Sequence, residues 1–316
     1  MKEACRSHVR ERELFFFCKS CRFGLRLKDK ISSFLYEGCT GRIMNWLIGL
    51  AGSVLIAAAA YVRRALTASG MAAAVVTGTL MFGFGDLPWY GLLLFFFLSS
   101  TLLSRYRRSL KKEAESGYEK TGRRDAGQVA ANGGLGLLLC TAAYIRPHEG
   151  WWAAFLGVMA AVTADTWATE VGGLSRKRPR SIRTGKPVAP GTSGGITALG
   201  LAAAAAGAVS IGLAAAAFGQ LSWGTSDPAW IPAAAAGGLC GALADSWIGA
   251  TWQRMNRCAS CGKEVESRFH CGEPAKPLRG LAWMNNDAVN LISSAAGGIV
   301  SALVWAALSF SLQGGT

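Results

Sequence analysis

Eight runs of apolar residues, each close to the length that crosses a lipid bilayer, occupy most of this chain. They cover roughly residues 45–62, 67–84, 88–104, 127–145, 151–171, 193–218, 231–252 and 287–310. A helix needs about 20 such residues to cross the hydrocarbon core, where its backbone must satisfy its own hydrogen bonds. Only 16% of the residues are charged, against about a quarter in a soluble domain. We therefore predict an all-α polytopic transmembrane helix bundle of about 7–8 spans.

The charges between the runs alternate in a way that indicates topology. Residues 105–124, 174–190 and 253–280 are rich in Lys and Arg, whereas the loops between them are not. Basic loops of membrane proteins lie on the cytoplasmic side, so we expect these three loops to be cytoplasmic. The net charge of +14 then reflects topology, and we do not expect a nucleic-acid partner.

The first 43 residues differ from the rest of the chain. They are polar and basic, and Met44 is followed directly by the apolar run Asn45–Leu50. We predict that residues 1–43 are a disordered or spurious extension and that residues 44–316 form the integral membrane domain.

A weak internal repeat places acids in corresponding positions. Ala164-Asp165-Thr166-Trp167 resembles Ala244-Asp245-Ser246-Trp247 near the ends of two runs. Five acids lie within or at the ends of apolar runs, all near the expected cytoplasmic end: Asp125, Asp165, Glu170, Asp245 and Asp287. Acids in membrane segments are costly and usually mark functional sites, although ion pairing or snorkelling is the structural alternative. Because all five share one face, we favour a catalytic site.

A basic strip and a glycine-rich turn could bind an anion beside these acids. The strip 176–186 contains Arg183 and Lys186, and it leads to Gly191-Thr192-Ser193-Gly194-Gly195 before an apolar run. Glycines let backbone amides face a ligand, and a helix N-terminus favours negative charge. The alternatives are topological charge for the strip and a helix cap for the turn.

Carboxylates beside phosphate-binding groups suggest a Mg²⁺–nucleotide or Mg²⁺–diphosphate site, because Mg²⁺ prefers carboxylate and phosphate oxygens. We assign Asp165 and Asp245 as its ligands. Asn132, Asn286 and Asn290 lie at helical spacings from these motifs and could bind a head group or hydrogen-bond between helices.

The loop 253–280 contains Cys258, Cys261, His270 and Cys271. These residue types suit structural Zn²⁺, and Cys-x-x-Cys is a good half-site. The adjacent His-Cys pair is less usual, so reduced thiols without metal stay an open alternative.

Several of these motifs together resemble a known family. The blocks are Leu66–Gly70, Arg124–Gly134, Ala164–Gly172, Gly191–Gly195, Ala244–Thr251 and Trp283–Asn290. They look like the signature blocks of the family catalogued as domain of unknown function 92, which includes transmembrane protein 19 and the plant phytyl-phosphate kinase.

The resemblance implies a reaction. The plant member suggests transfer of a phosphoryl group from a nucleoside triphosphate to an isoprenyl monophosphate, and similarity to CTP-using isoprenol kinases makes CTP a candidate donor. We therefore expect a multi-pass enzyme of the cell membrane with isoprenyl phosphate and nucleotide as partners. A transporter or lipid flippase without nucleotide chemistry is the alternative.

Overall fold

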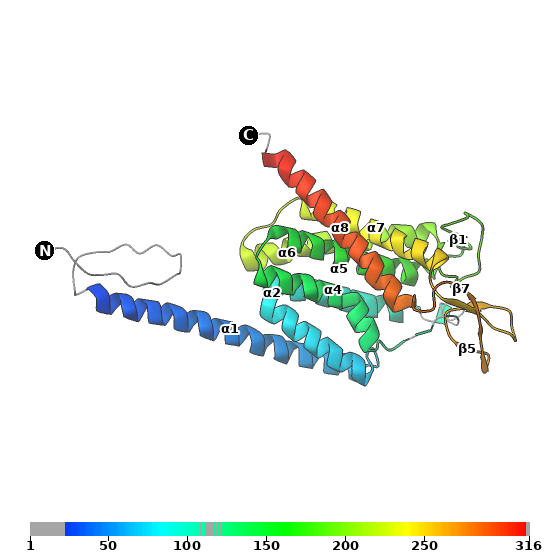
Figure 1. Ribbon diagram of the computed structural model, residues 1–316, viewed down its shortest axis with the longest axis horizontal. Coiled ribbons are helices and arrows are strands. Elements are labelled where there is room, and N and C mark those ends of the chain that lie inside the picture. The colour runs from blue at the N-terminus through cyan, green and yellow to red at the C-terminus, as the bar shows by residue number, and fades with distance from the viewer. Residues whose placement is uncertain (1–22, 108, 111–116, 118, 121, 314–316) are drawn as a thin grey trace. The chain divides into compact units, whose positions relative to one another are not determined.

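The computed structural model describes residues 23–107, 109, 110, 117, 119, 120 and 122–313 of the chain (Figure 1). Within them, seven long helices account for most of the structure. Their bounds are α1 Phe23–Val62, α2 Ala68–Arg105, α4 Ala126–Ile145, α5 Glu149–Gly172, α6 Ala198–Trp223, α7 Trp230–Thr251 and α8 Asn286–Gln313. Together they make the all-α membrane bundle that the sequence predicts.

The chain divides into two compact units, Met1–Met44 and Asn45–Thr316. Residues 1–22 lie outside the described part, and α1 begins at Phe23. That residues 1–43 are disordered or a spurious extension stays a prediction. The remaining description concerns the second unit.

Helix α2 is a folded-back pair of helical segments rather than one straight rod. Asp86 has non-helical dihedral angles, with φ of 59°, and its carboxylate accepts a hydrogen bond from Asn45 at 2.8 Å. A straight helix of 38 residues would be about 57 Å long, yet the Arg105 guanidinium contacts the Arg63 carbonyl. Both ends of α2 therefore lie at one end of the bundle, and α2 supplies two of the expected spans, 67–84 and 88–104.

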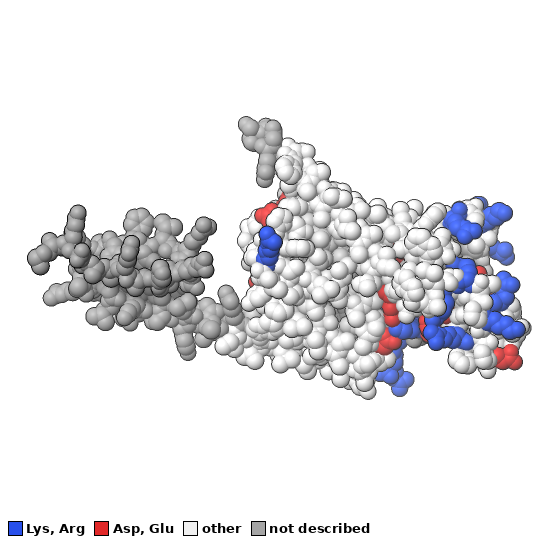
Figure 2. Space-filling view, viewed as in Figure 1, with Lys and Arg blue, Asp and Glu red and all other residues white. Residues whose placement is uncertain are grey.

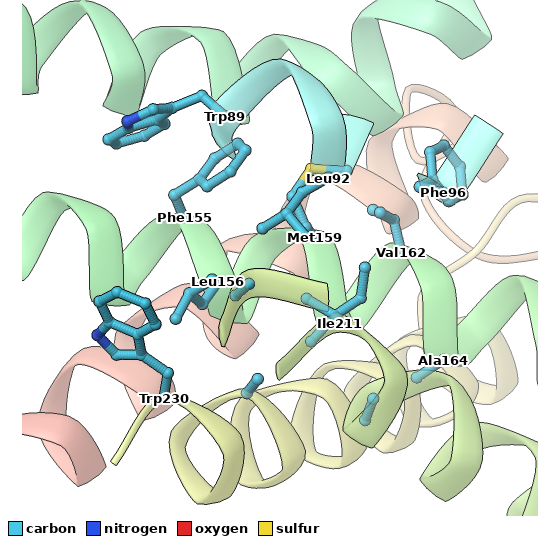
Figure 3. Close-up of a cluster of buried hydrophobic side chains, with 14 of the residues drawn as sticks. Trp89, Leu92, Phe96, Phe155, Leu156, Met159, Val162, Ala164, Ile211 and Trp230 are labelled. Atoms are coloured by element: carbon cyan, nitrogen blue, oxygen red, sulfur yellow. The ribbon is translucent and has the colours of Figure 1, made fainter. Parts of the chain in front are cut away.

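Six of the seven helices are long and apolar enough to cross a membrane, and α5 is the exception. Helix α5 lies at the centre of the bundle, packed against α2, α4, α6, α7 and α8. Trp152 and Phe155–Ala164 are buried along it, and Figure 3 shows Phe155, Leu156 and Met159 within the core. Because protein rather than lipid surrounds α5, this helix tolerates a lower hydrophobicity.

Small residues let α5, α7 and α8 approach closely. A Cβ atom added at Gly157 would lie 2.3 Å from the carbonyl oxygen of Gly297, and one at Gly237 would lie 2.5 Å from the same oxygen. Membrane helices commonly pack through such small residues, since apolar side chains gain little by leaving lipid. The alanine and glycine tracts of the sequence therefore form the tight centre of the bundle.

One end of the bundle carries most of the charge (Figure 2). This basic end is formed by residues 63–67, the described parts of 105–125, and residues 173–197 and 252–286. It also holds the strands β1 Arg180–Ser181, β2 Gly195–Ile196, β3 Met255–Arg257, β4 Glu264–Val265, β5 Phe269–His270, β6 Glu273–Pro274 and β7 Lys276–Arg279. Strands β4, β3 and β7 form an antiparallel sheet, β5 pairs with β6, and β1 pairs with β2.

The opposite end of the bundle is closed by aromatic rings. Trp152 contacts Trp89, Trp223 and Trp230 with ring centroids 4.9, 5.0 and 5.7 Å apart. Phe155 lies 4.5 Å from Trp89 in the same cluster, and both are visible in Figure 3. This end is therefore filled with large apolar side chains.

Candidate functional site

A cavity of about 530 Å³ opens at the basic end, and most of the residues predicted from sequence line it. They are Asn132, Asp165, Glu170, Gly191, Thr192, Ser193, Gly194, Gly195, Asp245, Asn286, Asp287 and Asn290. They come from α4, α5, α7, α8 and the segment that precedes α6. Segments far apart in the sequence thus meet around one polar space.

The two repeated motifs bring a pair of carboxylates together. Asp165 on α5 and Asp245 on α7 are both partly buried, and their charges lie close enough to interact. The Ser293 hydroxyl of α8 donates a hydrogen bond to Asp245 Oδ2 at 2.9 Å. Two interacting carboxylates in a protein interior favour a bound cation, which offsets their mutual repulsion.

A second pair of acids shares one lysine. Lys120 Nζ lies 3.1 Å from Asp125 Oδ2 and 2.5 Å from Asp287 Oδ2. Asp125 caps α4: its carboxylate accepts a hydrogen bond from the Gln128 backbone N–H, and its own backbone N–H donates one to the Gln128 side-chain oxygen. Lys120 lines the cavity, whereas Asp125 is not part of its lining. This group therefore joins the starts of α4 and α8.

These contacts shift the pKa values of the groups outside the spans. Burial alone would raise the pKa of Asp125, but the N–H of Gln128 and the Lys120 ammonium lower it below 3.8 overall. Burial likewise opposes the charge on Lys120, but Asp287 and Asp125 raise its pKa above 10.5. Lys120 and Asp125 are therefore both charged near neutral pH.

Glu170 lines the cavity from α5 and is held by contacts with α2 and Arg124. It accepts a hydrogen bond from the Ser104 hydroxyl, and its charge interacts with the partly buried Arg124. Arg124 also donates to the Thr101 hydroxyl at 3.1 Å. Glu170 therefore ties α5 to the second half of α2 while it lines the cavity.

The glycine-rich turn packs against the end of α7. Gly194 has φ of +77°, and an added Cβ would lie 2.4 Å from the Ala250 Cβ. The neighbouring Ser193 hydroxyl donates a hydrogen bond to the Gln253 side chain. Only glycine suits both the backbone and the space at residue 194, so the turn is fixed beside Asp245.

The basic residues that line the cavity differ from those expected. Arg183 and Lys186 are exposed on the loop between β1 and β2 and are absent from the lining. The cations that do line it are Arg64, Arg105, Lys120, Arg124 and Lys177. The sequence does not distinguish one basic loop residue from another, because tertiary contacts decide which of them face the cavity. The position of Lys120, five residues before Asp125, was the feature that could have indicated its place beside the site.

Two residues of the loop 253–280 also line the cavity without having been expected. Gln253 is buried and donates a hydrogen bond to Glu266 Oε1 at 3.0 Å. Burial raises the pKa of Glu266 from 4.5 to about 7. The loop therefore contributes a titrating acid to the wall.

The remaining predicted group, Cys258, Cys261, His270 and Cys271, lies together but outside the cavity lining. Among the described residues it is the one group of three or more potential metal ligands found within mutual reach. The predicted Mg²⁺ ligands instead form a carboxylate pair.

Mg²⁺ commonly binds through one or two protein carboxylates plus phosphate oxygens, so the pair Asp165 and Asp245 suits it. A nearby atom strengthens the fit. Asp287 Oδ1 is buried and has no hydrogen-bond partner among the described residues, and such an atom is costly unless a ligand satisfies it. The donor set of the cavity therefore fits Mg²⁺ with a phosphorylated ligand.

A smaller apolar cavity of about 70 Å³ adjoins this site between α1, α2 and α4. Its apolar lining includes Ile56, Ala57, Leu93, Leu94, Phe96 and Phe97. Arg124, Gln128 and Asn132 line both cavities. A polar space and an apolar slot therefore share one wall.

The fold and site define a multi-pass integral membrane protein with one polar, charge-lined cavity at its basic end. Comparison with known proteins then gives the family: residues 51–298 match the integral membrane protein family DUF92, and the chain belongs to it.

Two curated relatives support the assignment. The chain is 34% identical to Protein PGR of Arabidopsis thaliana over 263 residues, which cover 76% of this chain and 89% of the relative. It is 32% identical to the uncharacterized membrane protein MJ0933 of Methanocaldococcus jannaschii over 247 residues, 78% of this chain and 88% of the relative. No solved structure matches the chain.

Proposed function

We propose that this protein is a membrane-embedded phosphotransferase that converts an isoprenyl monophosphate, such as phytyl or prenyl phosphate, to its diphosphate. The donor is CTP or another nucleoside triphosphate with Mg²⁺. The membrane is the cell membrane, and the basic end faces the cytoplasm, where nucleotides are available.

One observation carries the proposal. The carboxylate pair Asp165 and Asp245, the glycine turn 191–195 and the cations Lys120 and Arg124 all line one cavity. Phosphoryl transfer is catalysed mainly by positioning and by offsetting negative charge. A cavity that combines acids, cations and backbone amides provides those functions.

The residues divide by role. Asp165 and Asp245 would hold Mg²⁺, which neutralises charge on the transferring group. Lys120, Arg124 and the turn bind phosphate oxygens, while Asn286 and Asn290 orient them. An oxygen of the acceptor monophosphate attacks the γ-phosphorus, the bond between that phosphorus and the β,γ-bridging oxygen breaks, and the nucleoside diphosphate leaves. The attacking oxygen is already anionic, so the step needs no general base.

The apolar slot supplies a place for the acceptor's chain. It meets the polar cavity at Arg124, Gln128 and Asn132, so a head group at these residues can lie in the polar cavity while its first isoprene unit enters the slot. The rest of the chain extends between helices toward lipid. This arrangement favours a lipid phosphate over a soluble acceptor.

The aromatic cluster at the opposite end favours an enzyme over a transporter or flippase. Trp89, Trp152, Phe155 and Trp230 fill the bundle there, whereas alternating access needs a path to both sides. A site open at one end suits chemistry on a lipid that stays in one leaflet.

Purified protein incubated with γ-labelled CTP, ATP or GTP, Mg²⁺ and C15–C20 prenyl monophosphates should yield labelled prenyl diphosphate. The Asp245→Asn variant is expected to yield none, because it loses one metal ligand. The proposal is wrong if folded wild-type protein gives no labelled diphosphate with any donor and acceptor pair.

A further inference from the structure

The lobe formed by residues 252–285 holds four metal-binding side chains at its tip. Cys258 and Cys261 lie in the turn between β3 and β4, and His270 and Cys271 lie at the turn between β5 and β6. Their potential ligand atoms all lie within 4.8 Å of one another. The two turns come from different strand pairs, so the pairing of the short strands does not by itself account for their meeting at the tip of the lobe.

The first turn has the backbone of a metal-binding loop. The N–H groups of Cys261 and Ser260 point to the Cys258 sulfur, and the Gly262 N–H donates to the Cys258 carbonyl at 3.0 Å. Gly262 has φ of +72° with nothing near its missing Cβ, so the glycine lets the chain turn back after Cys261.

The second turn explains how adjacent residues can serve as ligands of one ion. His270 pairs with Glu273 across the β5–β6 hairpin, which leaves Cys271 and Gly272 as its two-residue turn. Their φ angles are 53° and 81°, as a tight type I′ turn requires. In an extended strand, neighbouring side chains point to opposite faces, whereas this turn brings the His270 and Cys271 side chains to one side.

The distances fit tetrahedral coordination. Zinc bonds of about 2.3 Å to sulfur and 2.0–2.1 Å to nitrogen place the sulfur and nitrogen ligands about 3.5 Å apart in a tetrahedron. The His270 Nδ1 atom lies 3.5 Å from the Cys261 sulfur and 3.2 Å from the Cys271 sulfur. The Cys261 and Cys271 sulfurs and this nitrogen are therefore spaced for one ion, and the Cys258 sulfur lies within 4.8 Å of each of them.

We propose that Cys258, Cys261, His270 Nδ1 and Cys271 bind one structural zinc ion that holds this lobe against the cavity. Four protein ligands complete the tetrahedron, and no position stays open for catalysis. The zinc site does not depend on the proposed phosphotransferase activity.

The lobe needs such an ion because its own core is small. Met255, Val265 and Cys258 are its buried apolar side chains near the sheet, and β4 to β6 have two residues each. Units with so little apolar core usually need a metal or a disulfide to fold. Zinc binding would supply that free energy.

The ordered lobe in turn positions part of the cavity wall. Asn256 on β3 donates hydrogen bonds to the carbonyls of Glu266 and Ser267, both at 3.0 Å. Arg279 on β7 donates to the carbonyls of Gly249 and Ala250 at the end of α7, both at 3.1 Å. Loss of zinc would therefore loosen Glu266 and its link through Gln253 to Ser193.

The test is the metal content of the purified full chain, measured by mass spectrometry after dialysis in metal-free buffer. Wild type should hold about one zinc per chain. Cys261→Ser and Cys271→Ser should lose most of it, and the control Cys240→Ser, altered within α7, should keep it. Trypsin should cut within residues 254–279 faster after chelation, and added zinc should restore protection.

A second measurement on wild type covers the case in which the cysteine variants fail to fold. Protein produced with Co²⁺ in place of zinc should show the thiolate charge-transfer and visible bands of tetrahedral cobalt. Zinc below about a tenth per chain, a disulfide among Cys258, Cys261 and Cys271, or full zinc retention by Cys261→Ser would each overturn the proposal.

Discussion

Lys120 Nζ lies 2.5 Å from Asp287 Oδ2 across 167 positions of sequence. Lys120 also forms an ion pair with Asp125, so one ammonium group in the cavity lining links the starts of α4 and α8. A cation in this place fixes two acids and remains available to a phosphate.

Replacing this lysine tests its role. Lys120→Ala should lower kcat/KM for prenyl diphosphate formation on the order of 100-fold, because a positioned charge is lost where negative charge develops. Lys186→Ala is the matched control, since Lys186 is exposed and outside the cavity lining, and it should change the rate less than about threefold. Equal losses in the two variants would contradict the assignment.

The glycine turn gives a prediction on stability. Gly194→Ala should lower the free energy of unfolding by about 2–4 kcal/mol, because it adds left-handed strain and a clash with Ala250. Gly185 also has positive φ but nothing within 4 Å of an added Cβ, so Gly185→Ala should cost only about 1 kcal/mol. Thermal unfolding in detergent compares the two, and a Gly194→Ala variant as stable as Gly185→Ala would show that the turn does not pack against α7.

Glu266 makes the stability depend on pH. Its pKa is raised from 4.5 to about 7 by burial, so the folded state favours the protonated acid. The associated stabilisation is complete below the unfolded pKa and is lost as pH rises through about 7. Wild type should therefore lose stability relative to Glu266→Gln between about pH 4.5 and 7, by on the order of 3 kcal/mol, and the difference should stay constant above pH 7.

The measurement is thermal unfolding of both proteins across that pH range. Glu273→Gln, at an exposed position on β6, corrects for the removal of an acid from the same lobe. A difference between wild type and Glu266→Gln that stays constant with pH would show that Glu266 does not titrate there.

The apolar slot predicts a selective effect on the lipid acceptor. Gly133 lines the slot, so Gly133→Leu should fill it and raise KM for the prenyl phosphate about tenfold or more. Gly134 has nothing within 4 Å of an added Cβ and does not line the slot, so Gly134→Leu should leave KM nearly unchanged. An equal effect of both substitutions, or a rise in the nucleotide KM alone, would exclude the slot as the lipid site.

Much of this arrangement could be predicted from the sequence. The apolar runs predict the helix bundle because each is long enough to cross the bilayer, and a helix satisfies its own backbone hydrogen bonds in lipid. The position of Asp165 and Asp245 near one end of their runs predicts that they can meet. The sequence predicts two spans at residues 67–84 and 88–104, and α2 contains both because the chain turns back at Asp86.

The rest depends on tertiary contacts that no local pattern reveals. Arg183 and Lys186 looked as suitable for phosphate as Lys120, but they lie on an exposed loop. Glu266 reaches the cavity wall because Asn256 holds its backbone carbonyl within the lobe and Arg279 anchors the lobe to the end of α7. A spacing argument cannot identify such a residue, because its place depends on how two loops fold together.

The most direct test of the central claim is nucleotide-dependent thermal stabilisation of the purified protein. Wild type with Mg²⁺ and its preferred nucleoside triphosphate should gain about 2–3 kcal/mol of stability at 100 times Kd, and the gain should vanish without Mg²⁺. Asp165→Asn should lose the gain, whereas Asp86→Asn at the opposite end should keep it. No stabilisation by any Mg²⁺–nucleotide pair, or equal stabilisation of wild type and Asp165→Asn, would contradict a phosphate and Mg²⁺ site in this cavity.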